Sequence, residues 1–407
     1  MRVVHVDESN LKGTAQSSFR IHSGLREAGI DSLIVTRRDN MGGSDVLSGN
    51  RSVSRALSLI KPYIDSLPLR LYPNKSPFTI NWVPGRLPTQ INELDPDIVN
   101  LHWIGRGFLR IEEIKKINAP IVWRFPDMWP FTGGCHYSFD CERYTKSCGS
   151  CPALGSNTEY DISRIGWKRK KRILNLSNIT PVVTSDWLQS VAEQSSIFDG
   201  TEIKKIPNAV DTHVYKPIEQ ERAREIANLP KDKKILLFGA VNPSSNPRKG
   251  YDKLTDALSK LEGKYSTDEL ECVVFGSREI TDPDTKFNFS VRGKLLDERS
   301  LAILYSAADV FLMPSIAEAF GLTVIESLAC GTPVVAFEET GPGGLINHKK
   351  TGYLAKFGSP SDFCEGIQWV LKADHENLRT NARKVAQDRF DREKVTEQYR
   401  SLYAELA

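Results

Sequence analysis

The chain has 407 residues, which is too long for one ordinary hydrophobic core and suits two domains of roughly 200 residues each. Hydrophobic residues make up 40% and charged residues 26%, as in soluble globular proteins, and the net charge of +3 is too small to indicate a nucleic-acid partner. No basic and apolar leader opens the sequence, and no apolar run is long enough to span a bilayer. We therefore expect a cytoplasmic protein, at most peripheral to the inner face of a membrane.

The first third of the chain predicts strands that alternate with helices, interrupted by one irregular stretch. Buried strands are predicted at 2–6, 32–36, 97–103 and 120–125, with a helix between the first two. Gly13 lies in the first loop, where a glycine allows the backbone to approach a ligand closely, although it suits a simple turn equally well. Residues 46–88 carry many Ser, Pro and Asn residues and predict an irregular insertion on the first domain.

Four cysteines follow in one short segment: Cys135, Cys141, Cys148 and Cys151. Four thiols closed by a C-x-x-C pair can wrap a tetrahedral Zn²⁺ as a structural site, and they would leave no open position for catalysis. In a reducing cytosol a metal is favoured over two disulfides. Free thiols and a disulfide formed on oxidation remain the alternatives.

A basic run from Arg164 to Arg172 comes next, interleaved with Ile165 and Trp167. It could rest on anionic lipid headgroups and bring the protein to a membrane, or it could be the solvated face of a helix. A polar stretch with two prolines at 206–217 then predicts a domain boundary.

The second half of the chain again predicts strands and helices in alternation. Strands are predicted at 235–239, 271–276, 309–313 and 333–336, with helices between them, which indicates a doubly wound parallel sheet. Arg248 and Lys249 lie in the loop after the first of these strands, and Glu318 lies in the loop after the third. In such sheets, loops at the carboxyl ends of the strands bind ligands, and free amides at the start of a helix bind phosphate.

The string from Pro314 to Ala336, PSIAEAFGLTVIESLACGTPVVA, places Glu318 and Glu326 on either side of seven residues. It resembles the glutamate–seven–glutamate motif of retaining glycosyltransferases of family 4, which have the GT-B fold. The segment PDMWPFTGGCHY is similar to one subgroup of that family, which takes part in assembling bacterial surface polysaccharides. The resemblance implies an α/β protein with two Rossmann-like doubly wound domains facing across a deep cleft. Residues 1–207 would face the acceptor, residues 208–390 would bind the nucleotide sugar, and a last helix at 391–407 would return to the first domain.

The resemblance also implies roles for individual residues. Arg248 and Lys249 would neutralise the donor diphosphate in place of a metal cofactor, Glu318 would hold hydroxyl groups of the donor sugar, and Glu326 would hold the ribose. Further donor contacts would come from Gly13, Arg292, Leu295, Ala319, Phe320, Gly321, Leu322 and Thr323. Pro126 stands where the family has a histidine beside the transferring sugar, so that contact passes to Asp127 or is lost. Asp127 could orient the acceptor hydroxyl or cap the following turn.

The implied activity is the transfer of a hexose-type sugar from a UDP- or GDP-sugar to a hydroxyl group of a glycan or lipid-linked glycan, by front-face attack and with retention. Capsule, O-antigen or exopolysaccharide synthesis would use such a step. Two alternatives keep the fold: an epimerase or hydrolase of nucleotide sugars, or a non-catalytic partner that binds them. An epimerase needs no acceptor, and a non-catalytic partner would not need Glu318, Glu326, Arg248 and Lys249 together.

Overall fold

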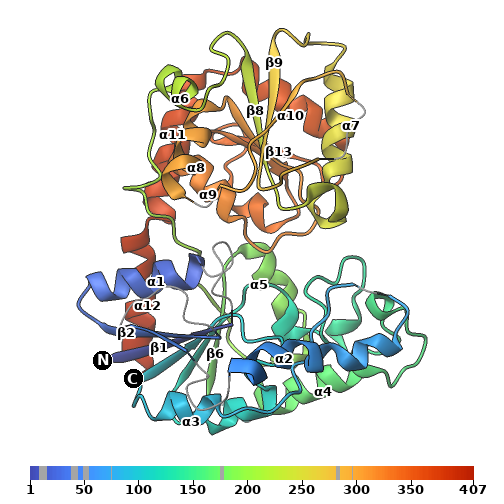
Figure 1. The fold of residues 1–407 in the computed structure, drawn as a ribbon, viewed down its shortest axis with the longest axis vertical. Helices are drawn as coiled ribbons and strands as arrows, with labels where there is room; N and C mark the ends of the chain where they lie inside the picture. The colour runs from blue at the N-terminus through green and yellow to red at the C-terminus, as the bar shows by residue number, and fades with distance from the viewer. Residues whose placement is uncertain are drawn as a thin grey trace. The chain divides into compact units, whose positions relative to one another are not determined.

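The structure is a computed structural model. It describes residues 1–8, 16–37, 45–48, 55–74, 76–174, 178–280, 285–295 and 297–407, without the side chains of 55–59. The chain forms two compact units (Figure 1), one made of Met1–Pro207 with Val395–Ala407 and the other of Asn208–Lys394. No helix of the described part of the chain is long and apolar enough to cross a membrane.

The first unit is built on a seven-stranded parallel sheet in the order β3-β2-β1-β4-β5-β6-β7. Its strands are β1 (Arg2–Asp7), β2 (Asp31–Thr36), β3 (Val46–Ser48), β4 (Ile98–Leu101), β5 (Ile121–Arg124), β6 (Ile179–Val183) and β7 (Lys204–Lys205). Every residue of β4 and β5 is buried. Continuous burial of this kind is expected where both faces of a parallel sheet are covered.

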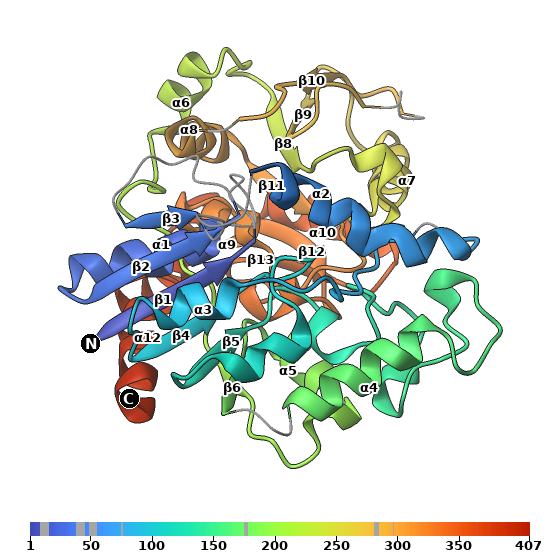
Figure 2. The same ribbon diagram turned by 60° about the horizontal axis from the view of Figure 1, so that its bottom comes forward.

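The helices of the first unit come from both ends of the sequence. They are α1 (Gln16–Glu27), α2 (Arg55–Ser66), α3 (Leu87–Asn92), α4 (Ile162–Leu174), α5 (Asp186–Glu193) and most of α12 (Arg392–Leu406). Helix α12 passes beside β1 and β4 in Figure 2, and the side-chain amide of Asn100 on β4 donates a hydrogen bond to the hydroxyl of Tyr403. A Cβ atom at Gly24 of α1 would lie 2.1 Å from Oγ1 of Thr396, so α1 and α12 are in close contact.

The prediction of an irregular insertion at 46–88 is wrong for much of this stretch. It contains the edge strand β3, the helix α2, a 3₁₀ helix at Leu67–Leu71 and the start of α3. Pro62 lies inside α2, where a proline removes a backbone donor and obscures a helical pattern in the sequence. Asp65 near the end of the helix is buried and accepts hydrogen bonds from the backbone N–H groups of Asn81 and Trp82, which connects the helix to that segment.

The second unit has a six-stranded parallel sheet in the order β10-β9-β8-β11-β12-β13. Its strands are β8 (Lys234–Gly239), β9 (Leu270–Phe275), β10 (Phe289–Val291), β11 (Val310–Met313), β12 (Val334–Phe337) and β13 (Gly352–Ala355). Its helices are α6 (Gln220–Ile226), α7 (Tyr251–Leu261), α8 (Glu298–Ala307), α9 (Leu322–Ala329), α10 (Pro360–Lys372) and α11 (His375–Arg389).

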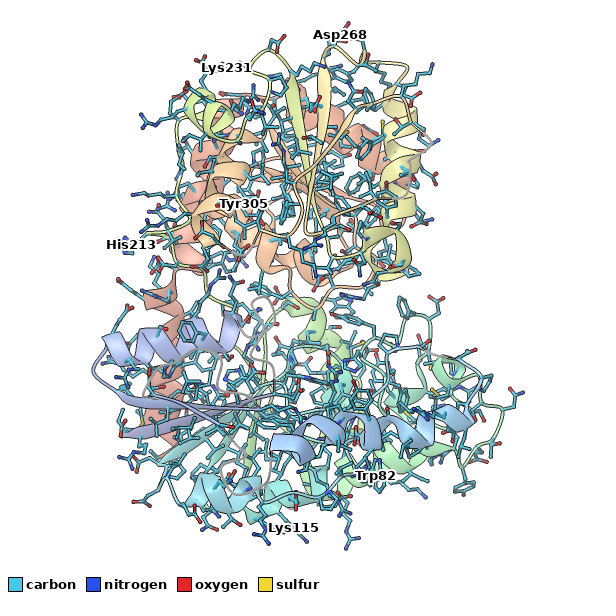
Figure 3. The ribbon with its side chains drawn as sticks, in the orientation of Figure 1. Trp82, Lys115, His213, Lys231, Asp268 and Tyr305 are labelled. Atoms are coloured by element: carbon cyan, nitrogen blue, oxygen red, sulfur yellow. The ribbon has the colours of Figure 1, made fainter. Side chains whose placement is uncertain are left out.

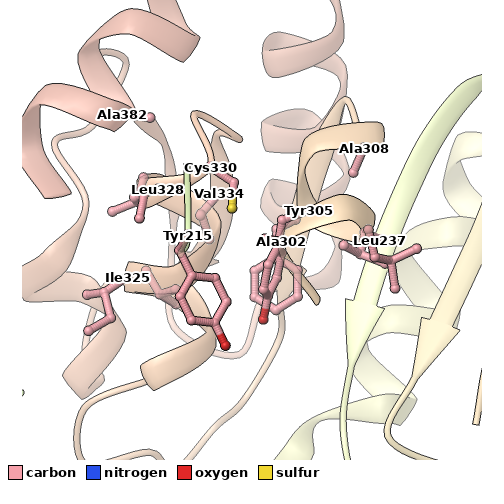
Figure 4. Packing of buried hydrophobic residues seen from close by; sticks show 14 of the residues in the cluster. Tyr215, Leu237, Ala302, Tyr305, Ala308, Ile325, Leu328, Cys330, Val334 and Ala382 are labelled. Carbon is pink, nitrogen blue, oxygen red and sulfur yellow. The ribbon is translucent and has the colours of Figure 1, made fainter. Parts of the chain in front are cut away.

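Alternate residues of the central strands contribute to two separate apolar layers. Leu237 and Val334 belong to the layer under α8, α9 and α11, part of which is shown in Figure 4. Their neighbours Leu236 and Val335 belong to the layer under α7 and α10. Because side chains alternate across a strand, the two layers lie on opposite faces of the sheet. This is the doubly wound arrangement that the sequence predicts, and that prediction is confirmed.

The strand order of each sheet reverses beside its first strand. In the second unit β8 lies between β9 and β11, and in the first unit β1 lies between β2 and β4. The loops that leave neighbouring strands at such a point diverge to opposite faces of the sheet and open a crevice at the carboxyl ends. A ligand site of the second unit is therefore expected at the loops after β8 and β11.

Candidate functional site

The loops after β8 and β11 bring three charged side chains together. Arg248 and Lys249 end a short 3₁₀ turn at Pro247–Lys249, and Glu318 lies five residues beyond the end of β11. Lys249 donates from Nζ to Oε2 of Glu318 at 2.8 Å, and Arg248 donates from an η nitrogen to the same oxygen at 3.2 Å. The two cations exceed the carboxylate by one charge, so this cluster attracts an anion.

The surroundings of Glu318 keep it ionised. Its side chain is 18% exposed, and that burial by itself would raise the pKa of the carboxyl. The charges of Lys249 and Arg248, with the hydrogen bonds that both donate, outweigh burial and hold the pKa of Glu318 below its ordinary value. At neutral pH the cluster therefore holds one carboxylate, whose oxygens accept hydrogen bonds only.

A glycine holds the two loops at their short separation. Gly250 has φ +63°, and a Cβ atom there would lie 1.9 Å from the carbonyl oxygen of Pro314. The loops also pair through the backbone, because the N–H of Ile316 donates to the carbonyl of Arg248 at 3.0 Å. Only glycine satisfies both the left-handed backbone and the close approach, so the position of Arg248 and Lys249 depends on it.

Residues 319–321 lead into helix α9, which begins at Leu322 with Gly321 as its N-cap at φ +99°. The ring of Phe320 is buried in the core, whereas Leu322 and Thr323 are half-buried. Gly341 supports this segment, since its N–H donates to the carbonyl of Glu318 at 2.9 Å and a Cβ atom there would lie 2.3 Å from the carbonyl carbon of Ala319. The first backbone N–H groups of a helix have no partner within the helix and suit a phosphate.

Glu326 lies in the second turn of α9 and is only 3% exposed. Its Oε2 accepts a hydrogen bond of 3.4 Å from the hydroxyl of Tyr305 on α8, a residue in the interior of the second unit (Figure 3). Burial, with the neighbouring charge of Glu326, raises the pKa of Tyr305 well above its ordinary value. Tyr305 was missed in the sequence because nothing local to it signals a contact 21 residues away, and the ribose role of Glu326 stays a prediction.

Arg292 and Leu295 lie beyond the end of β10, on a different strand from the charged cluster. The guanidinium of Arg292 donates to the carbonyl of Asn228 at 3.0 Å, and Leu295 packs against the apolar layer under α8 and α9. Both side chains already have contacts within the second unit, and their role in donor binding stays a prediction.

In the first unit, Asp127 follows β5 and contacts a histidine. Its Oδ1 accepts from the backbone N–H of Trp129 at 2.8 Å, and its Oδ2 lies 2.8 Å from Nδ1 of His136. Nε2 of His136 lies 3.1 Å from the hydroxyl of Thr79, and its ring is 4.9 Å from that of Trp103, just after β4. Asp127 thus caps the following turn, while its role towards an acceptor stays a prediction. His136 was missed, although it lies in the quoted PDMWPFTGGCHY segment.

Gly13 lies outside the described residues.

The basic run forms helix α4, and much of it turns inward: Lys170 is 1% exposed, and Arg169 donates to Glu112 at 2.9 Å. Lys168 and Arg172 are exposed, as is Ile165. The prediction of a solvated helix face is therefore wrong for Arg169 and Lys170. Fewer charged side chains of this run are then exposed and able to contact a lipid surface.

The four clustered cysteines surround one small cavity in the first unit and carry free thiols. Burial raises the pKa of Cys135 and of Cys148 to about 12. Within the described ranges, no three His, Cys, Asp or Glu side chains are already arranged to hold a metal ion. The zinc prediction is therefore not met by a preformed set of ligands.

Two doubly wound parallel sheets in one chain make a pair of Rossmann-like domains, the architecture of GT-B glycosyltransferases. Sucrose-phosphate synthase from Thermosynechococcus elongatus has a similar structure, with a TM-score of 0.71 and 18% identity over 100% of this chain and 98% of that one. HepE from Anabaena, solved in complex with UDP and glucose, has a TM-score of 0.66 and 15% identity over 100% of both chains. At these identities the likeness establishes the fold.

The family model of glycosyl transferases group 1 matches residues 219–389. D-inositol 3-phosphate glycosyltransferase 2 of Catenulispora acidiphila is 30% identical over 192 residues, 44% of each chain. N-acetyl-alpha-D-glucosaminyl L-malate synthase of Bacillus anthracis is 26% identical over 212 residues, 50% of this chain and 54% of that protein. The chain spans about half the length of these curated relatives.

Proposed function

We propose that the protein is a retaining glycosyltransferase that moves a hexose-type sugar from a UDP- or GDP-sugar to an acceptor hydroxyl. The observation that carries the proposal is the cluster of Lys249, Arg248 and Glu318 at the strand-order reversal of the second unit. The family match of residues 219–389, which contains all three residues, supports the same class of reaction.

Each part of the cluster has a task in this reaction. Negative charge grows on the leaving diphosphate as the glycosidic bond breaks, and fixed cations stabilise it most where they are already positioned. Lys249 has three N–H donors, so it can contact Glu318 and a phosphate oxygen together. The Glu318 carboxylate accepts hydrogen bonds from sugar hydroxyls, and the amides at the start of α9 add donors to the diphosphate. We propose that these groups act without a divalent metal.

On the acceptor side we propose that Asp127 orients the attacking hydroxyl, with His136 held beside it at 2.8 Å. The acceptor would be a glycan or lipid-linked glycan of a capsule, O-antigen or exopolysaccharide, made in the cytoplasm at the inner face of the membrane. The exposed Ile165, Lys168 and Arg172 on α4 support a peripheral contact with anionic lipid.

The test begins with the donor. Thermal shift and calorimetry with UDP, GDP and ADP and their common sugars, all in EDTA, should show tight binding of one nucleotide without metal. Binding by none of them would overturn the proposal, and binding only with added divalent metal would overturn its metal-free form.

The reaction is then followed by NMR with the donor so identified. Because the curated relatives are named for D-inositol 3-phosphate and L-malate, the acceptor screen includes both beside glycan acceptors. The expected product keeps the anomeric configuration of the donor, and an inverted product would contradict a retaining mechanism. A nucleotide sugar changed at one carbon without acceptor would show an epimerase instead. Free sugar and nucleoside diphosphate, with no transfer product, would show a hydrolase.

A further inference from the structure

The cysteine-rich segment of the first unit borders one small, partly open space. Cys135, Cys141, Cys148 and Cys151 all line one cavity of about 10 Å³, together with side chains that include Tyr144. A space of this size accommodates about one water-sized particle. Four thiols that line room for one small particle suit an ion better than an organic ligand.

Backbone hydrogen bonds hold Cys151 in place beside the cavity. Its N–H donates to Oδ2 of Asp161 at 2.8 Å, and its carbonyl oxygen accepts from the N–H of Leu154 at 3.1 Å. Groups that fix a ligand residue in this way orient it, as second-shell groups do around bound metals.

A buried lysine interacts electrostatically with two of the cysteines. Lys170 is 1% exposed, its Nζ donates to the carbonyl oxygens of Trp129 and Thr132, and it lies 4.0 Å from the centre of the Trp129 ring. Burial lowers the pKa of Lys170 to about 7, and a negative charge on Cys135 or Cys148 would raise it. Asp127, whose carboxylate would also raise the pKa of Lys170, is engaged with His136. A buried charge is costly unless an opposite charge accompanies it.

We propose that Cys135, Cys141, Cys148 and Cys151 bind one structural Zn²⁺, with the ammonium of Lys170 as a counter-charge. Four thiols lose four protons on binding, so the site changes from neutral to a zinc tetrathiolate of net charge −2. A protonated Lys170 would offset part of that charge. All four coordination positions are filled by sulfur, so the ion holds the segment together and does no chemistry.

The described thiols are not yet arranged as a metal site. Zinc–sulfur bonds of about 2.3 Å in a tetrahedron need the sulfur atoms about 3.8 Å from one another. Rotation of the cysteine side chains toward the common cavity is the adjustment that the proposal requires. The zinc proposal makes no use of the proposed transferase activity, so each of the two proposals can fail without the other.

The test measures zinc by elemental analysis in the full chain, purified under reducing conditions without chelator. We expect about one zinc per chain, and loss of most of it in Cys148→Ala. Cys364→Ala is the matched control, because Cys364 is another buried cysteine but lies on α10 in the second unit. Zinc that stays in Cys148→Ala, or is absent from the wild-type chain after incubation with zinc, would overturn the proposal.

A second measurement does not depend on the variant folding. Co²⁺ added to the metal-free wild-type chain should produce the thiolate charge-transfer and tetrahedral absorption bands of a cobalt tetrathiolate. Spectra without these bands would overturn the proposal. Mass spectrometry that finds a disulfide among the four cysteines in the freshly purified protein would overturn it as well, and would establish the redox alternative.

Discussion

Replacing Lys249 by alanine separates a diphosphate site from an ordinary surface ion pair. In the proposed complex Lys249 donates to the donor diphosphate as well as to Glu318, which it contacts at 2.8 Å. A hydrogen bond from a charged donor contributes about 1.5–3 kcal/mol. Since about 1.4 kcal/mol corresponds to a tenfold change, Lys249→Ala should weaken nucleoside diphosphate binding by about 10- to 100-fold. The bare nucleoside has no phosphate, so its affinity should stay within about twofold.

Calorimetry with both ligands in EDTA checks this prediction. Lys253→Ala is the matched control, because Lys253 lies four residues further on, on α7, and pairs with Asp252. The control should bind the diphosphate as the wild-type chain does. Equal diphosphate affinity in wild type and Lys249→Ala would refute the reasoning, and so would an equal loss for the nucleoside and the diphosphate.

Two further predictions concern stability. Gly250→Ala should lower the free energy of unfolding by more than Gly358→Ala, because both glycines have φ above +60° but only a Cβ at Gly250 would meet the Pro314 carbonyl. Gly358→Ala should lose about 1–2 kcal/mol for its left-handed backbone, and equal losses in urea titrations would contradict the role assigned to Gly250. Burial by itself would raise the pKa of Glu112, but Arg169 and Arg110 lower it from 4.5 to about 2. The ionised Glu112 carboxylate therefore adds at most about 3 kcal/mol to the free energy of unfolding before screening by solvent. This contribution is complete above pH 4.5 and is lost as the pH falls toward 2. Urea titrations across this pH range should find a smaller loss of stability in Glu112→Gln than in the wild-type chain.

The fold could be predicted because its signals are local. Apolar runs such as 235–239 and 309–313 predict buried parallel strands, and the structure has β8 and β11 at these places. Loops that follow neighbouring parallel strands leave the sheet at one edge, so a sequence that places Arg248 after one strand and Glu318 after another already implies their proximity. The structure brings them to 3.2 Å.

Other features depend on contacts between distant parts of the chain. Helix α2 contains Pro62 and adjoins Ser-rich sequence, so its local pattern does not predict a helix, and the contacts of its Asp65 with residues 81–82 form only in the folded unit. The hydrogen bond between Tyr305 and Glu326 joins two helices. The contact between Asp127 and His136 closes a loop whose path the residue types do not specify.

The central claim is that a nucleotide sugar binds where the strand order of the second unit reverses. A crystal structure of the protein with its preferred nucleoside diphosphate, grown in EDTA, tests this most directly. The proposal predicts a diphosphate oxygen about 3 Å from Nζ of Lys249, close to the start of α9 and with no metal ion. A nucleotide bound elsewhere, or one whose phosphates are held by a metal away from Arg248 and Lys249, would contradict it.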